Sequence, residues 1–235
     1  VPEGAGADAR ERGLTHGEQA SHHQVGEAGR DGEHRDGYGD DRGHRGEAAC
    51  EPEQELYWFQ RASNVIERMT GQPPRGFRAP SYRFSRTTLD VLVQEGMAYD
   101  ASLMGDDIPY LLENDTGQVV ELPTHYAMDD WPHFMVSRDL AYMMSPKSPS
   151  QAMEGYQAEF DAMWEYGGLW IAVWHPFLSG RLARCVAMAR LIEYMHAKGQ
   201  VWFATLEEIA VHVKRLIAAG TWTPRIDRLP YYDGP

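Results

Sequence analysis

The segment that most constrains the fold is an apolar run over 169–174, which stops at His175 and is followed at once by Pro176. A run of this length is typical of a strand buried on both faces, as in parallel sheets with helical crossovers. Pro176 cannot donate a backbone hydrogen bond, so the strand is expected to end there. His175 would then lie at the carboxyl end of a strand, the edge that carries the chemistry in α/β folds. Position alone does not distinguish a functional histidine from a core histidine bonded to a neighbouring carbonyl.

Helical and strand-like patterns alternate along most of the chain, from about residue 51 to residue 219. Thr205 and Glu208, for example, form a capping-box pattern that indicates the start of a helix. Repeating helix and strand units predict an α/β fold with a parallel sheet, open or rolled into a barrel. We expect helices over 51–70, 85–94, 150–166, 182–197 and 206–219, and strands over 76–80, 98–102, 119–123, 169–174 and 201–204.

The first 49 residues differ in composition from the rest of the chain. They are crowded with Gly, Asp, Glu, Arg and His and show no helical or alternating apolar period. Burial of so few apolar groups cannot offset the backbone entropy lost on ordering, so residues 1–49 are predicted to be disordered. No predicted helix or strand would preorganise a metal site among the histidines of this segment, which are His16, His22, His23, His34 and His44.

Charge and cysteine content exclude several classes of protein. The formal net charge of -13 argues against nucleic-acid and anionic-membrane partners, because phosphate binding draws on clustered Lys and Arg. No apolar run approaches the roughly 20 residues needed to cross a bilayer, and the first residues lack the order of a secretion signal. Cys50 and Cys185 form neither a disulfide framework nor a zinc motif, and Cys185 is expected to pack within a helix. We therefore expect a soluble, cytoplasmic chain.

Several blocks of the chain resemble the second half of polysaccharide deacetylases, carbohydrate esterases of the nodulation-factor deacetylase type, and especially their cytoplasmic peptidoglycan-deacetylase-like branch. The blocks occur in the family's order and read GFRAPSYRFSRTTLDVLVQEGMAYDASLMGDDIPY, ELPTHYAMDDWPHF, WHPFLSGR and VWFATLEEIAVHV. The resemblance implies an α/β fold, an incomplete distorted (β/α) barrel of the polysaccharide deacetylase type. Residues 50–220 would be the C-terminal part of this TIM-barrel-like domain, and 221–235 a tail. The implied activity is metal-dependent hydrolysis of acetamido or related non-peptide C–N bonds, commonly on zinc.

Amide hydrolysis requires an activated water, stabilisation of the oxyanion and a proton for the departing amine. Histidine, with an unperturbed pKa of about 6.5, suits the last task, and the resemblance implies that His175 is the general acid. It also implies that Asp130 holds the tautomer of this histidine and that Arg78 orients and keeps ionised a neighbouring carboxylate. The residues implied to contact substrate are Trp131, Asp129, Pro80 and Tyr82.

The residues themselves leave other interpretations open. Arg78 can equally form a structural ion pair, and Asp129 with Asp130 can form a solvated turn beside a core tryptophan. The functional interpretation requires that Arg78, Asp130 and His175 converge at one mouth of a rolled sheet.

In the family, the front half of the sequence supplies a pair of Asp residues and two histidines one helical turn apart, which bind the metal. This part of the pattern is not recognisable here. The acidic pair Asp40 and Asp41 follows no apolar strand, and His22 and His23 are adjacent rather than turn-spaced. Either the first segment binds metal in an unfamiliar way or it is not the family's sequence. Our hypothesis is that residues 1–49 are a truncated or misread leader joined to a deacetylase second half, so that the metal ligands are unknown and activity is impaired.

Two functions follow from the sequence. The first is hydrolysis of an N-acetylated glycan or a small amide, and the second is a catalytically inactive remnant or carbohydrate-binding product. Fold-level similarity does not choose between glycan and small-amide substrates.

Overall fold

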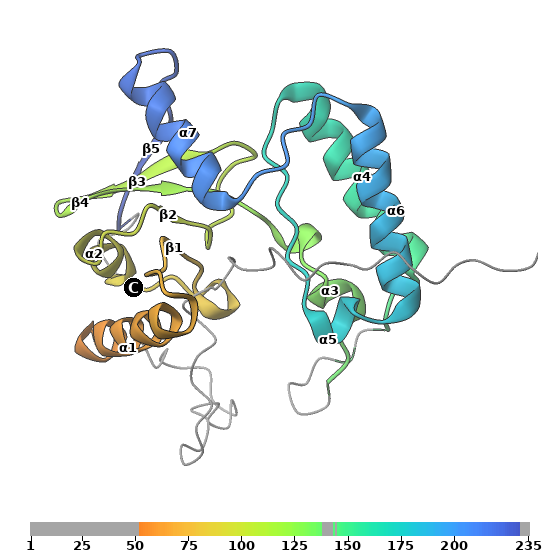
Figure 1. Ribbon diagram of the computed structural model, residues 1–235, viewed down its shortest axis with the longest axis horizontal. Helices are drawn as coiled ribbons and strands as arrows, with labels where there is room; N and C mark the ends of the chain where they lie inside the picture. The colour runs from red at the N-terminus through yellow and green to blue at the C-terminus, as the bar shows by residue number, and fades with distance from the viewer. Residues whose placement is uncertain (1–51, 138–142, 144, 231–235) are drawn as a thin grey trace, which may run out of the picture.

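The computed structural model describes residues 52–137, 143 and 145–230, and shows an α/β protein with an unclosed five-stranded sheet (Figure 1). The expected disordered segment 1–49 and the end of the tail, 231–235, lie outside the described residues. The sheet order is β1-β2-β4-β3-β5, with β1 at Gly76–Phe77, β2 at Tyr99–Asp100, β3 at Tyr110–Asn114, β4 at Gly117–Glu121 and β5 at Ile226–Arg228. The helices are α1 (Pro52–Thr70), α2 (Thr88–Gln94), α3 (Trp131–Phe134), α4 (Pro149–Tyr166), α5 (Pro176–Ser179), α6 (Leu182–Lys198) and α7 (Leu206–Ala218), with short 3-10 turns at η2 (Pro80–Tyr82) and η3 (Tyr126–Met128).

The long helices form where their periodicity and caps predict them. In α7 the Thr205 hydroxyl accepts a hydrogen bond from the Glu208 amide while the Glu208 side chain accepts one from the Thr205 amide, which confirms the predicted capping box. Ser148 and Gln151 form the same arrangement at the start of α4. That helix ends at Gly167, whose φ of 78° lies in the left-handed region that glycine adopts without a steric penalty.

The sheet is mixed, which corrects the expectation of a parallel sheet. β1, β2 and β4 pair in parallel, but β3 pairs antiparallel with β4, and β5 adds to β3 in parallel. The antiparallel pair is a hairpin whose turn is closed by the Asn114 side chain, which accepts hydrogen bonds from the amides of Thr116 and Gly117. Neither β3 nor β5 was expected from the sequence.

Two expected strands are not strands in the structure. Residues 169–174 and 201–204 belong to no sheet within the described part of the chain, apart from one parallel bridge between Val173 and Asp129. A strand is defined by its partner, and neither segment has a neighbouring strand along its length. The expected strand over 76–80 is also shorter, because β1 ends at Phe77 and η2 begins at Pro80.

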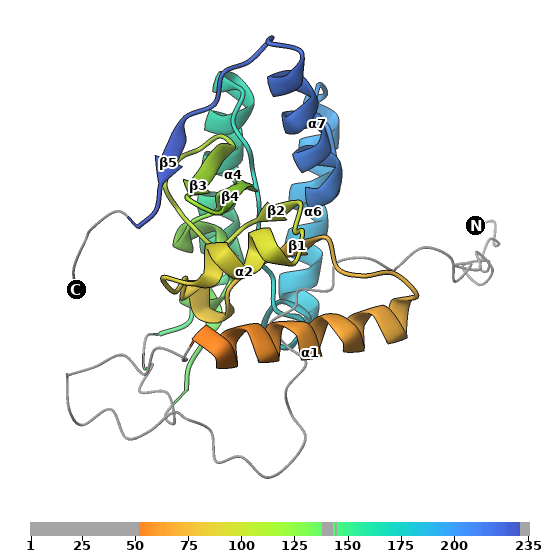
Figure 2. The same ribbon diagram turned by 90° about the vertical axis from the view of Figure 1, so that its left-hand side faces the viewer.

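Helices cover both faces of the sheet, and the strand alternation assigns residues to each face (Figure 2). Val119 of β4 packs with α1 and α2, including Phe59 and Leu92, whereas the next residue, Val120, packs with Ala210 of α7. A third cluster joins α4 to α6 and is placed to one side of the sheet in Figure 1. Its fully or nearly buried members include Tyr156, Phe160, Leu191 and Met195.

Helix α6 buries one face only. Leu191 and Met195 point inward as expected, but Ile192 is exposed, and Cys185 is exposed rather than packed. Among the described helices, none is both long and apolar enough to span a membrane.

Candidate active site

Asp130 and His175 meet because two segments distant in sequence run side by side. The Asp130 amide donates to the carbonyl of Val173 at 2.9 Å, and the Val173 amide donates to the carbonyl of Met128 at 2.9 Å. Asp130 stands directly before α3, and His175 directly before α5, whose first residue is Pro176. Proline is favoured in a first helical turn, since its φ is already helical and the missing amide proton would have no partner there. The two side chains are therefore fixed at the starts of two short helices.

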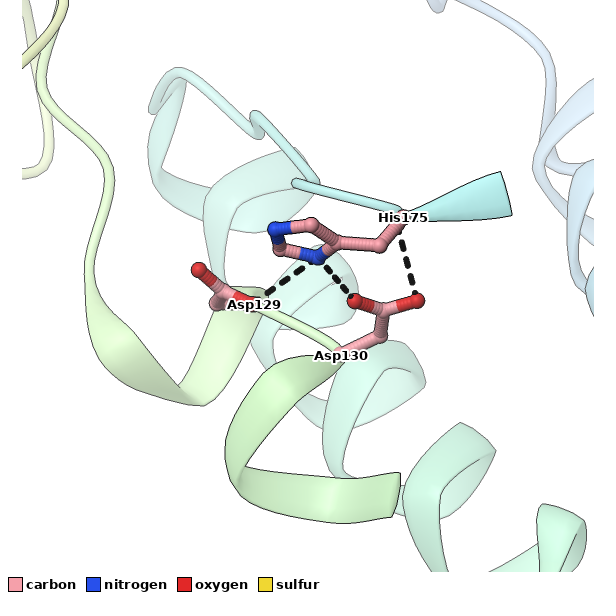
Figure 3. A group of neighbouring side chains, drawn as sticks. All are labelled: Asp129, Asp130 and His175. Atoms are coloured by element: carbon pink, nitrogen blue, oxygen red, sulfur yellow. Dashed lines mark hydrogen bonds and ion pairs between the residues drawn. The ribbon is translucent and has the colours of Figure 1, made fainter. Parts of the chain in front are cut away.

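The Asp130 carboxylate is fully buried and binds His175 twice (Figure 3). His175 Nδ1 lies 2.6 Å from Asp130 Oδ1, and the His175 amide donates to Oδ2 at 3.0 Å. The Ser179 hydroxyl also donates to Oδ2. A carboxylate with these partners accepts the Nδ1 proton, which fixes the tautomer of His175 and leaves Nε2 as the nitrogen that gains or loses a proton.

Asp129 is a second buried carboxylate beside the same ring. Its Oδ1 lies 3.7 Å from His175 Nδ1 and accepts the Trp131 amide at 2.7 Å, while its Oδ2 accepts the Tyr82 hydroxyl at 2.6 Å. Burial first, and the hydrogen bond to Asp129 second, raise the pKa of Tyr82, so this hydroxyl remains a proton donor. Tyr82 and Ser81 both have positive φ, 60° and 53°, which is strained for residues other than glycine.

Aromatic rings surround His175. The ring of Trp131 lies edge-on at 5.4 Å between centroids, and that of Phe177 at 5.7 Å. Phe177 is 59% exposed and Tyr126, which contacts Tyr82, is 58% exposed. Sequence reasoning named Trp131 but missed Phe177 and Ser179, although both lie in the block WHPFLSGR.

Arg78 is held by the residue that follows β2 rather than by this group. It is buried, and its Nε donates to the carbonyl of Ala101 at 2.7 Å, while one terminal nitrogen has no hydrogen-bond partner within the described residues. No ion pair between Arg78 and Asp129 or Asp130 is present among the described side chains. Arg78 and His175 nevertheless line the same groove, and the charge of Arg78 acts on Tyr82 by lowering its pKa against the larger effect of burial. Pro80 is exposed and begins the turn that carries Tyr82.

A pair of buried acids supports the segment that follows β1. Asp100 and Glu121 lie opposite each other at the ends of the parallel strands β2 and β4, and both are fully buried. Asp100 accepts the Ser102 hydroxyl at 2.8 Å, and the same oxygen of Ser102 accepts the amide of Ala79 at 2.7 Å. Burial and the neighbouring charge of Asp100 raise the pKa of Glu121 well above its usual range, and burial raises that of Asp100. Each carboxyl of this pair therefore keeps its proton to a higher pH than an exposed carboxyl does.

By spacing, Asp129, Asp130 and His175 are the described residues that can hold a metal ion, since their ligand atoms lie within 4.8 Å of one another. The bonding of these atoms does not fit a metal well. His175 Nδ1 faces both carboxylates and cannot donate its proton to Asp130 and ligate a metal at once. Oδ2 of Asp129 already accepts a hydrogen bond from the hydroxyl of Tyr82. The group fits an Asp–His proton-transfer pair better than a metal centre.

The chain thus combines an unclosed α/β fold with a buried Asp–His pair beside aromatic rings. No protein-family model matches the chain. It is 26% identical over 195 residues to a peptidoglycan deacetylase from Helicobacter pylori, covering 71% of this chain and 66% of that protein. A polysaccharide deacetylase structure from Mycobacterium smegmatis matches with a TM-score of 0.71 and 34% identity over 80% of this chain and 65% of that one. Puue allantoinase matches with a TM-score of 0.60 and 25% identity over 76% and 56% of the two chains.

These similarities support the polysaccharide deacetylase family for this chain. The chain spans less than two thirds of the length of each of these three relatives.

Proposed function

We propose that the site takes part in hydrolysis of an acetamido C–N bond in an N-acetylated glycan, with His175 as the general acid. The observation that carries this proposal is the hydrogen bond of 2.6 Å between His175 Nδ1 and the buried Asp130. It is supported by the similarity to proteins named peptidoglycan deacetylase and polysaccharide deacetylase.

In the proposed step, the tetrahedral adduct of water and the acetamido carbonyl collapses, so that the C=O bond re-forms as the C–N bond breaks. The bonding electrons stay on the nitrogen, which takes the Nε2 proton of protonated His175, and acetate and the free amine are released. Asp130 keeps the ring oriented and stabilises the imidazolium before transfer, because its carboxylate faces Nδ1 at hydrogen-bond distance. Trp131 and Phe177 offer apolar faces on which a sugar ring can pack, and the buried Asp129 accepts the amide of Trp131 and so fixes the start of α3. Arg78 would orient a carboxylate other than those of Asp129 and Asp130.

The metal implied by the resemblance, a divalent ion such as zinc, would supply an activated water. The bonds of Asp130 and His175, with Asp129 beside them, fit a proton-transfer pair better than a metal centre. We therefore propose no role in metal binding for these three residues. Well-fitting ligands for such an ion are not identified among the residues that the structure describes, and zinc stays a proposal. A cytoplasmic location is proposed as well and can be tested by cell fractionation.

A second candidate is a carbohydrate-binding protein without catalysis. The observation that favours it is the combination of an aromatic rim around His175 with no well-fitting metal group in the described part of the chain. A small cyclic amide is the alternative substrate class, favoured by the similarity to a protein named allantoinase.

The test is acetate release from N-acetylated peptidoglycan by the full chain, with metal content measured on the same sample. We expect His175→Ala to abolish release and His196→Ala, on the far end of α6, to retain it. Glycan binding with no acetate release above background in any sample would replace the hydrolase proposal with the binding one. Activity on allantoin alone would move the substrate to the small amides.

A further inference from the structure

Two buried carboxylates face the same nitrogen of His175, and only one of them can accept its proton. Nδ1 of His175 lies 2.6 Å from Oδ1 of Asp130 and 3.7 Å from Oδ1 of Asp129. A carboxyl group turns readily about its terminal torsion, so the choice of acceptor depends on what holds each carboxylate in place. The Nδ1 proton therefore has a defined acceptor only where Asp130 is held in one orientation.

The other oxygen of Asp130, Oδ2, is held by the short helix α5. It accepts one hydrogen bond from the amide of His175 at 3.0 Å and another from the hydroxyl of Ser179. Within the described residues the ion-pair partner of Asp130 is His175, and no lysine or arginine forms one with it. A fully buried carboxylate without such a cation depends on neutral donors of this kind.

The hydroxyl of Ser179 is aimed at Asp130 by a tight turn. A serine in a helix often bonds its hydroxyl to the carbonyl one turn back, but here the carbonyl of His175 already accepts the Ser179 amide at 2.8 Å. The hydroxyl instead donates to a residue 49 positions away in sequence. A Cβ at Gly180 would lie 2.2 Å from the carbonyl oxygen of Pro176, so the turn leaves no room for a larger residue after Ser179.

Helix α6 holds the backbone around Ser179 in place. The carbonyl of Ser179 accepts a hydrogen bond from the thiol of Cys185 at 3.2 Å, and the carbonyl of Leu178 accepts one from the guanidinium of Arg184 at 2.7 Å. Arg184 also lies over the ring of Phe134, 4.2 Å from its centroid, and so joins this turn to α3. The donor and the carboxylate that it binds are thus fixed to each other through two helices.

We propose that Ser179 is a positioning residue that acts through Asp130. Its hydroxyl holds Oδ2, so that Oδ1 of Asp130, rather than Asp129, accepts the Nδ1 proton of His175. Ser179 is 4% exposed and does not line the groove, so it acts on the ring and not on a substrate. This inference rests on the proposed role of His175 as the general acid, in which Nε2 must point in one direction.

The test follows the ring protons of His175 by NMR in the full chain and three variants. Ser179→Ala removes the hydroxyl and Ser179→Thr keeps one. Ser63→Ala is the matched control, because it removes a buried hydroxyl on α1 that has no hydrogen-bond partner among the described residues. We expect the Nδ1 proton to exchange with water about tenfold faster in Ser179→Ala, since a hydrogen bond to a charged group is lost, and within about twofold of the wild type in the other two variants.

Acetate release from N-acetylated peptidoglycan is the second measurement. Because Ser179 does not reach the groove, we expect Ser179→Ala to lower kcat about ten- to hundredfold and to leave KM within about twofold of the wild type. A rise in KM with unchanged kcat would assign Ser179 to substrate binding and overturn the positioning role.

Unchanged exchange of the Nδ1 proton in Ser179→Ala also overturns the proposal. So does an increase of the same size in Ser179→Thr or Ser63→Ala, because the effect would then come from packing and not from the hydroxyl. The exchange measurement does not use activity. Absence of acetate release from the wild type, together with the expected exchange rates, would refute the proposed function and leave the positioning of His175 by Ser179 in place.

Discussion

The hydroxyl of Tyr82 donates a hydrogen bond of 2.6 Å to Asp129, from a turn that lies 47 residues away in sequence. Tyr82 and Ser81 adopt left-handed backbone conformations to reach this position. Strain of this kind costs about 1–3 kcal/mol per residue and persists only where the surroundings enforce it. The contact links the segment after β1 to the carboxylate beside His175.

Replacing Tyr82 with phenylalanine removes this bond and leaves a buried carboxylate oxygen without its donor. We expect a loss of about 1–3 kcal/mol in the free energy of unfolding, measured by urea titration. Tyr126→Phe, whose ring contacts Tyr82 but is mostly exposed, is the matched control and should change stability by less than about 0.5 kcal/mol. Equal effects of the two substitutions would contradict the assigned contact.

Asp130→Asn keeps the shape of the side chain but removes the charge that accepts the Nδ1 proton of His175. An amide can turn its NH₂ group toward the ring, so we expect His175 to change to the tautomer protonated at Nε2. The ¹⁵N chemical shifts of the two ring nitrogens report this change directly. Asp107→Asn, at an exposed position, should leave the spectrum of His175 as it is. An unchanged tautomer in the Asp130 variant would show that Asp130 does not set it.

Local sequence signals predicted the local structure well. The capping box of Thr205 with Glu208 is confirmed because all its bonds form within one helical turn. The expected end of the helix over 150–166 is confirmed as well, since α4 ends at Tyr166 and is followed by Gly167. Asp130 and His175, which lie 45 residues apart in sequence, were named through the family resemblance, and the structure brings them together.

Features that depend on distant partners were not predictable in this way. The segment over 201–204 has a strand's composition, but a strand needs a neighbour, and the described chain provides none. The hairpin of β3 was missed because its turn, Asn114 to Gly117, was not recognised. Ser179 and the Asp100–Glu121 pair were missed because only folding places their partners beside them.

Thr205→Ala removes the side-chain acceptor for the Glu208 amide at the start of α7. The loss of an N-cap of this type costs about 1 kcal/mol, so we expect a lower midpoint in urea with an unchanged slope. The Thr205 amide, which lowers the pKa of Glu208, remains in the variant. Thr223→Ala, at an exposed position after α7, is the control and should have no measurable effect. A loss no larger than that of the control would mean that the cap adds nothing to stability.

Glu121→Gln tests the raised pKa of Glu121 through the pH dependence of stability. Burial and the charge of Asp100 raise the pKa of Glu121 in the folded protein, whereas an unfolded glutamate titrates near about 4.3. The protonated form therefore contributes stability that is complete below the unfolded pKa and is lost as the pH rises through the raised folded value. Glutamine cannot lose a proton, so we expect the variant to be more stable than the wild type at pH 8, and this advantage to shrink or vanish at pH 4.

Glu154→Gln, at an exposed site on α4, is the control and should show no such pH dependence of stability. Urea unfolding of both variants and the wild type at the two pH values provides the test. An equal difference between Glu121→Gln and wild type at pH 4 and pH 8 would mean that folding does not raise the pKa of Glu121.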